Sequence, residues 1–353
     1  MNISCSAFLL AFLCLFPISC QRPFLADDDE HSKAKWDVAW SGTERLVLGL
    51  HATPFEWQLI SENQYARFDA DNKLLELRQL SRNAGVLGLP ALSDNTFVRI
   101  TTNDDAKQVI EFHLSRNPAE IHTALTEDLA GTSDSFIDVE TLGTNNLGAF
   151  STDGTLFMLP VKVLPDQHYA LLIFQILHNL AHTSFASVEM VKRVNLESLS
   201  SDLNKLKSIR FIDGNFYVTS QEGAWRITPS GNKEKIFTQW MTDVFSWKGD
   251  IYITGLNPYD LHKSTDNGLN WENVGVSSEL KIVANANDLL FTQAAPSLVY
   301  QRVEADLMKA KNISLPIGYS PQQAIYYSVV YFAGKYYFSV DREVYMTEEV
   351  VVE

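Results

Sequence analysis

The sequence predicts an all-β fold: a β-propeller of four-stranded blades, with seven blades expected and six or eight also compatible. Three observations lead to this prediction. A strand–turn–strand segment recurs in the C-terminal half, its spacing matches one blade, and the chain length suits a single closed ring. With 353 residues, 46% of them hydrophobic and 20% charged, the composition is that of a folded globular protein. A TIM barrel would need long helical patterns between its strands, and the helical stretches here are short.

The recurring segment consists of two short strands joined by a tight turn. Four copies align, and they cover residues 211–219, 246–254, 284–292 and 331–339. Their central turn residues are Gly214, Gly249, Asn287 and Gly334. Gly and Asn tolerate the positive φ of tight turns, and the β-branched and aromatic residues on either side favour strands. The four turns are 35, 38 and 47 positions apart, which is about the length of one blade.

Weaker copies of this turn occur in the N-terminal half, at Asp71-Asn72, Asp94-Asn95 and Asp153-Gly154. The segment 36–40 precedes them all, and we expect it to form the strand that completes the last blade and closes the ring. A closed ring leaves no long free sheet edges. Two further stretches, Pro118–Leu129 and Leu196–Leu206, are compatible with short helices or with loops between blades.

The first twenty residues have the features of an export signal. Residues 6–18 are apolar and uncharged, a length that suits a signal peptide and is too short for a membrane-spanning helix. The three cysteines of the chain, Cys5, Cys14 and Cys20, all lie here, so the body holds no disulfide framework and no thiolate metal site. An ordinary cleaved signal with an incidental cysteine is one interpretation.

The other interpretation is a lipid anchor, because Pro17-Ile18-Ser19-Cys20 resembles the lipobox of bacterial lipoproteins, with Pro17 where that family usually has Leu. The resemblance implies cleavage before Cys20, a diacylglycerol thioether and an acylated amine on Cys20, and sorting to the outer membrane because Gln21 follows. We therefore expect a protein of the bacterial cell envelope. Its predicted organisation is a signal peptide over 1–19, an acidic tether over 20–35 and a single propeller domain over 36–353.

One motif in the body is specific. The segment 264–271 fits the pattern Ser-x-Asp-x-Gly-x-x-Trp through Ser264, Asp266, Gly268 and Trp271. It resembles the Asp-box, or BNR repeat, of sialidase-like propellers, which implies a fold element at the periphery of a blade and not a catalytic site. We expect Asp266 to accept hydrogen bonds from amides of its own turn, Gly268 to be left-handed and Trp271 to pack on the blade. The segment 151–154 resembles a shortened copy.

The net charge and the spacing of candidate ligands limit the partners and metal sites that the sequence predicts. The net charge of −15 argues against a nucleic-acid partner, which would require a basic surface, and no catalytic residue, metal site or cofactor can be assigned. His178 and His182 have a zinc-compatible helical spacing, but the run 169–177 predicts a buried strand, so structural histidines are expected. The segment 69–72 resembles the start of a calcium loop without its Gly and distant Glu, so a β-turn is expected.

Sialidases add to the propeller an Arg-Ile-Pro motif, an arginine triad and a Tyr–Glu pair. Here the nearest segments, 99–101 and 226–228, are predicted strands, and the tyrosine-rich segment 326–338 is expected in the core more than on a carbohydrate-binding surface. The sequence thus favours a non-catalytic envelope lipoprotein that binds a protein or glycan partner. The alternatives are a sialidase-like or other glycoside hydrolase, and an assembly or structural factor for a membrane complex.

Overall fold

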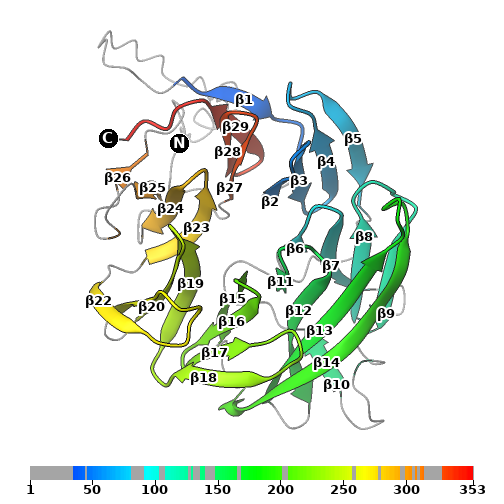
Figure 1. The fold of residues 1–353 in the computed structure, drawn as a ribbon. Coiled ribbons are helices and arrows are strands. Elements are labelled where there is room, and N and C mark those ends of the chain that lie inside the picture. Colours follow the sequence, from blue (N-terminus) through cyan, green and yellow to red (C-terminus); the bar gives the residue numbers. More distant parts are fainter. Residues whose placement is uncertain are drawn as a thin grey trace, which may run out of the picture.

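In the part of the chain that the computed structural model describes, seven antiparallel β-sheets are arranged as blades around a central axis (Figure 1). This agrees with the predicted propeller and with the expected number of blades. The structure describes residues 35–43, 46–80, 91–102, 108–125, 129, 136–139, 148–164, 168–200, 206–256, 260–276, 280–294, 299–303, 307, 311–313 and 328–352. None of these residues belongs to a helix long and apolar enough to cross a membrane.

The first three blades use the N-terminal half of the described chain. Blade 1 contains β2 (Val47–Ala52), β3 (Trp57–Ser61), β4 (Gln64–Phe68) and β5 (Leu74–Gln79). Blade 2 contains β6 (Ala91–Leu92), β7 (Thr96–Thr102), β8 (Gln108–Leu114) and β9 (Ile121–Leu125). Blade 3 contains β10 (Phe136–Val139), β11 (Ala149–Phe150), β12 (Leu156–Leu164), β13 (His168–His178) and β14 (Phe185–Ser200). Both β10 and β11 pair with β12, which makes this blade five-stranded.

The remaining four blades follow in chain order. Blade 4 contains β15 (Leu206–Ile212), β16 (Asn215–Ser220), β17 (Gly223–Ile227) and β18 (Lys233–Phe237). Blade 5 contains β19 (Met241–Trp247), β20 (Asp250–Gly255), β21 (Asp260–Ser264) and β22 (Glu272–Val276). Blade 6 contains β23 (Leu280–Ala286), β24 (Leu289–Ala294), β25 (Val299–Val303) and β26 (Lys311–Asn312). Blade 7 contains β27 (Val329–Phe332), β28 (Lys335–Val340), β29 (Glu343–Thr347) and β1 (Asp37–Trp40).

The N-terminal strand β1 closes the ring, as the sequence predicts for the segment 36–40. It lies antiparallel to β29, with Asp37 opposite Met346 and Trp40 opposite Val344. In Figure 1 this joins the blue start of the chain to the red end. The Trp40 ring then packs 5.1 Å from the Phe68 ring of blade 1, so closure also seals the joint between blades 7 and 1.

The helical interpretation of two stretches was wrong, because both contain strands. Pro118–Leu129 includes β9, whose residues alternate between exposed Ile121 and Thr123 and half-buried His122 and Ala124. A two-residue alternation is the period of a strand with one face on its neighbour. Leu196–Leu206 begins in β14 and ends at the start of β15, and Leu196 is buried between blades 3 and 4.

Apolar side chains fill the spaces between the blades and form the core. Among the described residues, six of the seven joints hold clusters of seven or more buried apolar side chains. The joint between blades 1 and 2 differs, because its cluster has four members: Ile60, Tyr65, Leu80 and Phe97. Something other than apolar packing must therefore hold this joint.

The antiparallel order of the strands gives the ring two distinct faces. Turns that follow the first and third strands of a four-stranded blade open on one face, which we call the hairpin face. In the five-stranded blade 3, the turns after β11 and β13 open on this face. Its described turns include 53–56, 69–73, 93–95, 115–120, 151–155, 179–184, 213–214, 228–232, 248–249, 265–271, 287–288 and 333–334. Turns that follow the second strands, such as Asp341-Arg342 of blade 7, open on the opposite face.

Candidate functional site

The turn between β21 and β22 carries the most specific motif of the sequence. The Oδ1 atom of Asp266 accepts hydrogen bonds from the backbone N–H of Asn270 and from the Ser264 hydroxyl, both at 2.8 Å, and Oδ2 accepts from Asn270 Nδ2 at 2.6 Å. The bonds from Asn270, followed by that from Ser264, lower the pKa of Asp266 to about 2. Ser264 Oγ also accepts the N–H of Gly268 at 2.8 Å. The ionised carboxylate thus ties the turn together.

This turn also fastens blade 5 to blade 4. The carbonyl of Asn267 accepts hydrogen bonds from Tyr217 Oη at 2.9 Å and from Arg226 Nη1 at 3.1 Å. Gly268 has a φ of +76°, and a Cβ added there would lie 2.5 Å from Tyr217 Oη. Both the left-handed backbone and the close approach of Tyr217 therefore require glycine.

Trp271 extends the same joint, since its ring centroid lies 5.3 Å from that of Phe237 in blade 4. A related turn occurs in blade 3, where Asp153 Oδ1 accepts the Ser151 hydroxyl at 2.6 Å and the Thr155 N–H at 3.1 Å. That turn joins β11 to β12 of blade 3, whereas the 264–271 turn joins the last two strands of blade 5. The assignment of either turn to the Asp-box family stays a prediction.

A network of buried charges occupies the joint between blades 1 and 2. Arg67 donates from Nε and Nη2 to the two oxygens of Glu56 at 2.9 and 2.6 Å, and from Nη1 to Glu76 at 2.9 Å. Glu76 in turn accepts from Arg78 Nη2 at 2.8 Å. We call Glu56, Arg67, Glu76 and Arg78 the charge layer. Negative and positive groups alternate along the charge layer, so each charge that is buried at the joint lies next to one of opposite sign.

The charge layer reaches across the joint to blade 2. Arg78 Nη2 donates to the carbonyl of Ser115 at 3.2 Å, and its guanidinium lies 5.2 Å from the Tyr65 ring and 5.7 Å from the Phe97 ring. Phe97 also stacks against His113, with ring centroids 4.6 Å apart. Cation–π contacts and charge-assisted hydrogen bonds thus replace the apolar packing found at the other joints.

Two carboxyl groups at this joint, Glu56 and Glu111, have lowered pKa values despite their burial. Burial acts to raise the pKa of Glu56, but the hydrogen bonds and charge of Arg67 outweigh it, so the pKa lies below its usual value. Glu111 behaves in the same way, with burial opposed by His113 and by Arg99, whose Nε lies 2.6 Å from Glu111 Oε2. For His113, burial lowers the pKa. A general acid needs a raised carboxyl pKa, so these groups are suited to structural ion pairing.

The innermost strands carry polar groups near the axis. Arg210 of β15 pairs with Asp243 of β19, with two N–O distances of 3.3 Å. Hydroxyl groups of the second strands support the first strands: Thr219, Thr254 and Ser339 each accept a backbone N–H, at 2.8 to 3.2 Å. In blades 4 and 5 the register of the first two strands shifts next to these N–H groups, before Ser208 and before Asp243. The threonine hydroxyl there accepts the N–H that the shift moves away from its backbone partner.

The remaining sequence-predicted residues have mostly structural surroundings. His178 ends the strand β13, as expected, and its Nε2 lies 2.9 Å from Thr96 Oγ1, while the His182 ring centroid is 5.5 Å away. Within the described ranges, no three His, Cys, Asp or Glu side chains gather into a metal site. Asp69 accepts backbone N–H groups of Asp71 and Lys73 inside its own turn, at 3.0 and 2.9 Å.

The arginine and tyrosine candidates are likewise strand and core residues. Arg99 lies in β7 and Arg226 in β17, each paired with a glutamate. Tyr336, Tyr337 and Phe338 are buried in blade 7, as expected. Tyr326, Tyr327 and the proposed lipidation site Cys20 lie outside the described residues.

The charge layer and the buried hydroxyls were not predicted from the sequence. The hydroxyls had a visible signal, because all four recurring segments end in Thr or Ser, at Thr219, Thr254, Thr292 and Ser339. The charge layer had a weaker one: Glu76 and Arg78 alternate with leucines along one strand, so both charged side chains share a face.

Comparisons with known proteins support the fold. No protein-family model matches the chain, and no curated protein sequence matches it. Among solved structures, the extracellular domain of the putative hybrid two-component system BT4673 from B. thetaiotaomicron has a TM-score of 0.54 and 12% identity, over 90% of this chain and 40% of that one. The Neurospora crassa Pan2 WD40 domain has a TM-score of 0.52 and 8% identity, over 91% and 98%.

PorZ from Porphyromonas gingivalis, described as an essential bacterial surface component of the type-IX secretion system, has a TM-score of 0.50 and 10% identity over 90% of this chain. The chain spans about two fifths of the length of PorZ and of BT4673 (39% and 40%). At these identities the likeness shows the fold alone: this chain is a β-propeller.

Proposed function

We propose that this protein is an envelope-anchored, non-catalytic propeller that binds a protein or glycan partner, with its lipid anchor at Cys20. The observation that carries the proposal is that the buried carboxylates form ion pairs with arginines. Glu56 and Glu111 have lowered pKa values and are paired with arginines that join strands and blades. A glycosidase acid needs the opposite, a carboxyl group that retains its proton near neutral pH. These groups instead stabilise the ring.

The described turns of the ring are short and hydrogen-bonded, which suits binding. Turns held by several hydrogen bonds, such as 264–271, keep their shape when a partner docks, which lowers the entropy lost on binding. Two solved structures with this fold are described as a bacterial surface component and an extracellular domain. The proposed envelope location places this propeller in a similar environment.

The proposal is tested with the immobilised mature chain as bait for envelope proteins and envelope glycans. We expect at least one component to be retained saturably. It should be eluted from the column with its mass unchanged, because the propeller binds it without cleaving it. Cys20→Ser is the matched control, because this variant should no longer associate with the membrane but should still bind the partner. If no component is retained, binding is contradicted. If a glycan leaves the column shortened, a glycoside hydrolase is favoured instead.

A further inference from the structure

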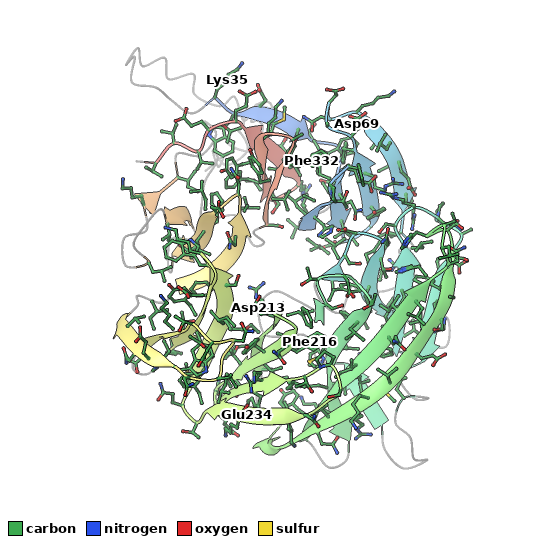
Figure 2. All side chains as sticks on the ribbon, in the orientation of Figure 1. Lys35, Asp69, Asp213, Phe216, Glu234 and Phe332 are labelled. Atoms are coloured by element: carbon green, nitrogen blue, oxygen red, sulfur yellow. The ribbon has the colours of Figure 1, made fainter. Side chains whose placement is uncertain are left out.

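The N-terminal tether joins the propeller at the hairpin face. β1 begins with Asp37 opposite Met346, and Met346 Sδ accepts a hydrogen bond from Asn72 Nδ2 at 2.8 Å. Asn72 belongs to a turn of the hairpin face, so Asp37 lies at that face too. Figure 2 shows Lys35 at the outer rim beside blade 7, with Asp69 of the neighbouring blade 1 farther along the rim. Any anchor at Cys20 therefore pulls on this side of the ring.

The span of the tether is comparable with the thickness of the ring. Fifteen residue steps separate Cys20 from Lys35, which gives a root-mean-square span of about 20 Å for a flexible chain and about 50 Å when fully extended. The ring is about as thick as its strands are long, and a strand of six residues spans about 20 Å. The hairpin face, where the tether begins, can therefore meet the membrane directly, whereas the opposite face would require the tether to run along the full thickness of the ring.

Three strongly exposed apolar side chains stand on the hairpin face. Phe55 of blade 1 is 74% exposed, Leu269 of blade 5 is 62% exposed, and Leu180 of blade 3 is fully exposed. They come from alternate blades, so they form three separated contact points around the ring. Isolated apolar residues are common on protein surfaces, but these three share the face at which the tether arrives.

The turns that carry these side chains satisfy backbone groups internally. The N–H of Phe55 donates to Thr53 Oγ1 at 3.1 Å, and the N–H of Leu269 donates to the carbonyl of Asp266 at 3.4 Å. In the turn of Leu180, the N–H of Thr183 donates to Asn179 Oδ1 at 2.8 Å. Because these N–H groups already have partners, the tips can enter a headgroup region with little loss of hydrogen bonding.

The charge of this face selects the kind of lipid. Among the described turns of this face, exposed acids outnumber exposed bases. The acids are Asp71, Asp94, Asp153, Asp213 and Asp288, and the bases are Lys73, Arg116 and Lys248. Figure 2 shows one of these acids, Asp213, beside the centre of the ring. The acids repel anionic headgroups and are compatible with zwitterionic ones.

We infer that the hairpin face rests on a zwitterionic lipid surface through Phe55, Leu180 and Leu269, which leaves the opposite face free for the partner. This inference deepens the proposed function and rests on its anchor at Cys20. Partial insertion of apolar tips strengthens the attachment that acyl chains provide and fixes the orientation of the ring.

The orientation is tested on the lipidated protein in phosphatidylcholine vesicles. Phe55→Cys carries a fluorophore on the hairpin face, and Arg342→Cys carries it on the opposite face as the matched control. A nitroxide lipid should quench the first label at least threefold more than the second. Equal quenching, or stronger quenching at Arg342, overturns the inference. Fatty-acid labelling of Cys20 is measured separately, so that loss of the anchor is recognised as failure of the proposed function.

A second arm does not need the anchor. Cys20→Ser should still float weakly with phosphatidylcholine vesicles, and adding Phe55→Ser, Leu180→Ser and Leu269→Ser should reduce the floated fraction at least threefold. Replacing half of the lipid with phosphatidylglycerol should reduce it as well. Because the three side chains are exposed, circular dichroism and melting temperature should be unchanged. Flotation that is insensitive to the three serines overturns the lipid contact.

Discussion

Replacing Arg67 with methionine tests whether the charge layer holds blades 1 and 2 together. The Glu56 side chain is 4% exposed and receives two hydrogen bonds from Arg67, at 2.9 and 2.6 Å. Among the described residues, Arg116 Nε, 3.9 Å from Glu56 Oε1, then provides the remaining cationic contact. Removing one partner of a buried ion pair costs about 3–5 kcal/mol, because the other charge stays buried. We expect a loss of this size in the free energy of unfolding at pH 7.

The loss should depend on pH with a defined sign. In the natural protein the pKa of Glu56 is lowered, so its stabilising contribution is complete above the usual value of 4.5 and is lost as the pH falls through the folded-state pKa. Without Arg67, burial raises the pKa of Glu56 instead. The penalty of Arg67→Met should therefore shrink as the pH falls toward 5 and the carboxyl group binds a proton.

Urea unfolding at pH 7 and pH 5 measures both effects. Lys263→Met is the matched control, because Lys263 and Asp250, 2.7 Å apart, are both partly exposed and lie within one blade, and such surface pairs contribute about 1 kcal/mol or less. The double variant Glu56→Gln/Arg67→Met should regain part of the lost stability. A cost of Arg67→Met no larger than that of Lys263→Met, or an equal cost at both pH values, would contradict the role of the charge layer.

Three further predictions concern turns and pH. Asp266→Ala should lower the melting temperature, because Asn270 loses its acceptors, and Asp266→Asn should lower it less. Since the pKa of Asp266 is about 2, the stability that the carboxylate contributes should be lost only as the pH falls from 3.8 toward 2. Equal losses for the two variants would contradict the role of the carboxylate. Gly268→Ala should cost about 1–3 kcal/mol, and Tyr217→Phe added to it should restore part of this in thermal scans; no restoration would mean that the hydroxyl is not the obstacle. Burial lowers the pKa of His113, so the free energy of unfolding should begin to fall as the pH drops below 6.5. His113→Gln should reduce this dependence of the free energy of unfolding on pH between pH 6.5 and 5. An unchanged dependence would exclude His113 as its cause.

The blades could be predicted because their turns depend on local chemistry. Gly214, Gly249 and Gly334 all have φ between +81° and +85°, and Asn287 has a φ of +49°, so residues that tolerate this conformation mark each turn in the sequence. Strand β1 was predictable for a related reason, since its aromatic and β-branched residues favour a strand even though its partner β29 lies at the other end of the chain.

The charge layer could not be predicted because it depends on which strands face each other. Glu56, Arg67 and Glu76 lie on three different segments, and single-sequence patterns give no reason to place two acids around one arginine. The stretch Pro118–Leu129 was misassigned because β9 is short and half exposed, so its two-residue alternation covers too few positions to exclude a helix. Tertiary context decided both cases.

The intact mass of the mature N-terminal peptide tests most directly the claim that this propeller works at a membrane. We predict a peptide that begins at Cys20 and carries a diacylglycerol thioether and an acylated amine, and we expect Cys20→Ser to abolish both the lipid and recovery in the membrane fraction. A mature chain that begins elsewhere, or one that begins at Cys20 with a free thiol, would contradict this claim.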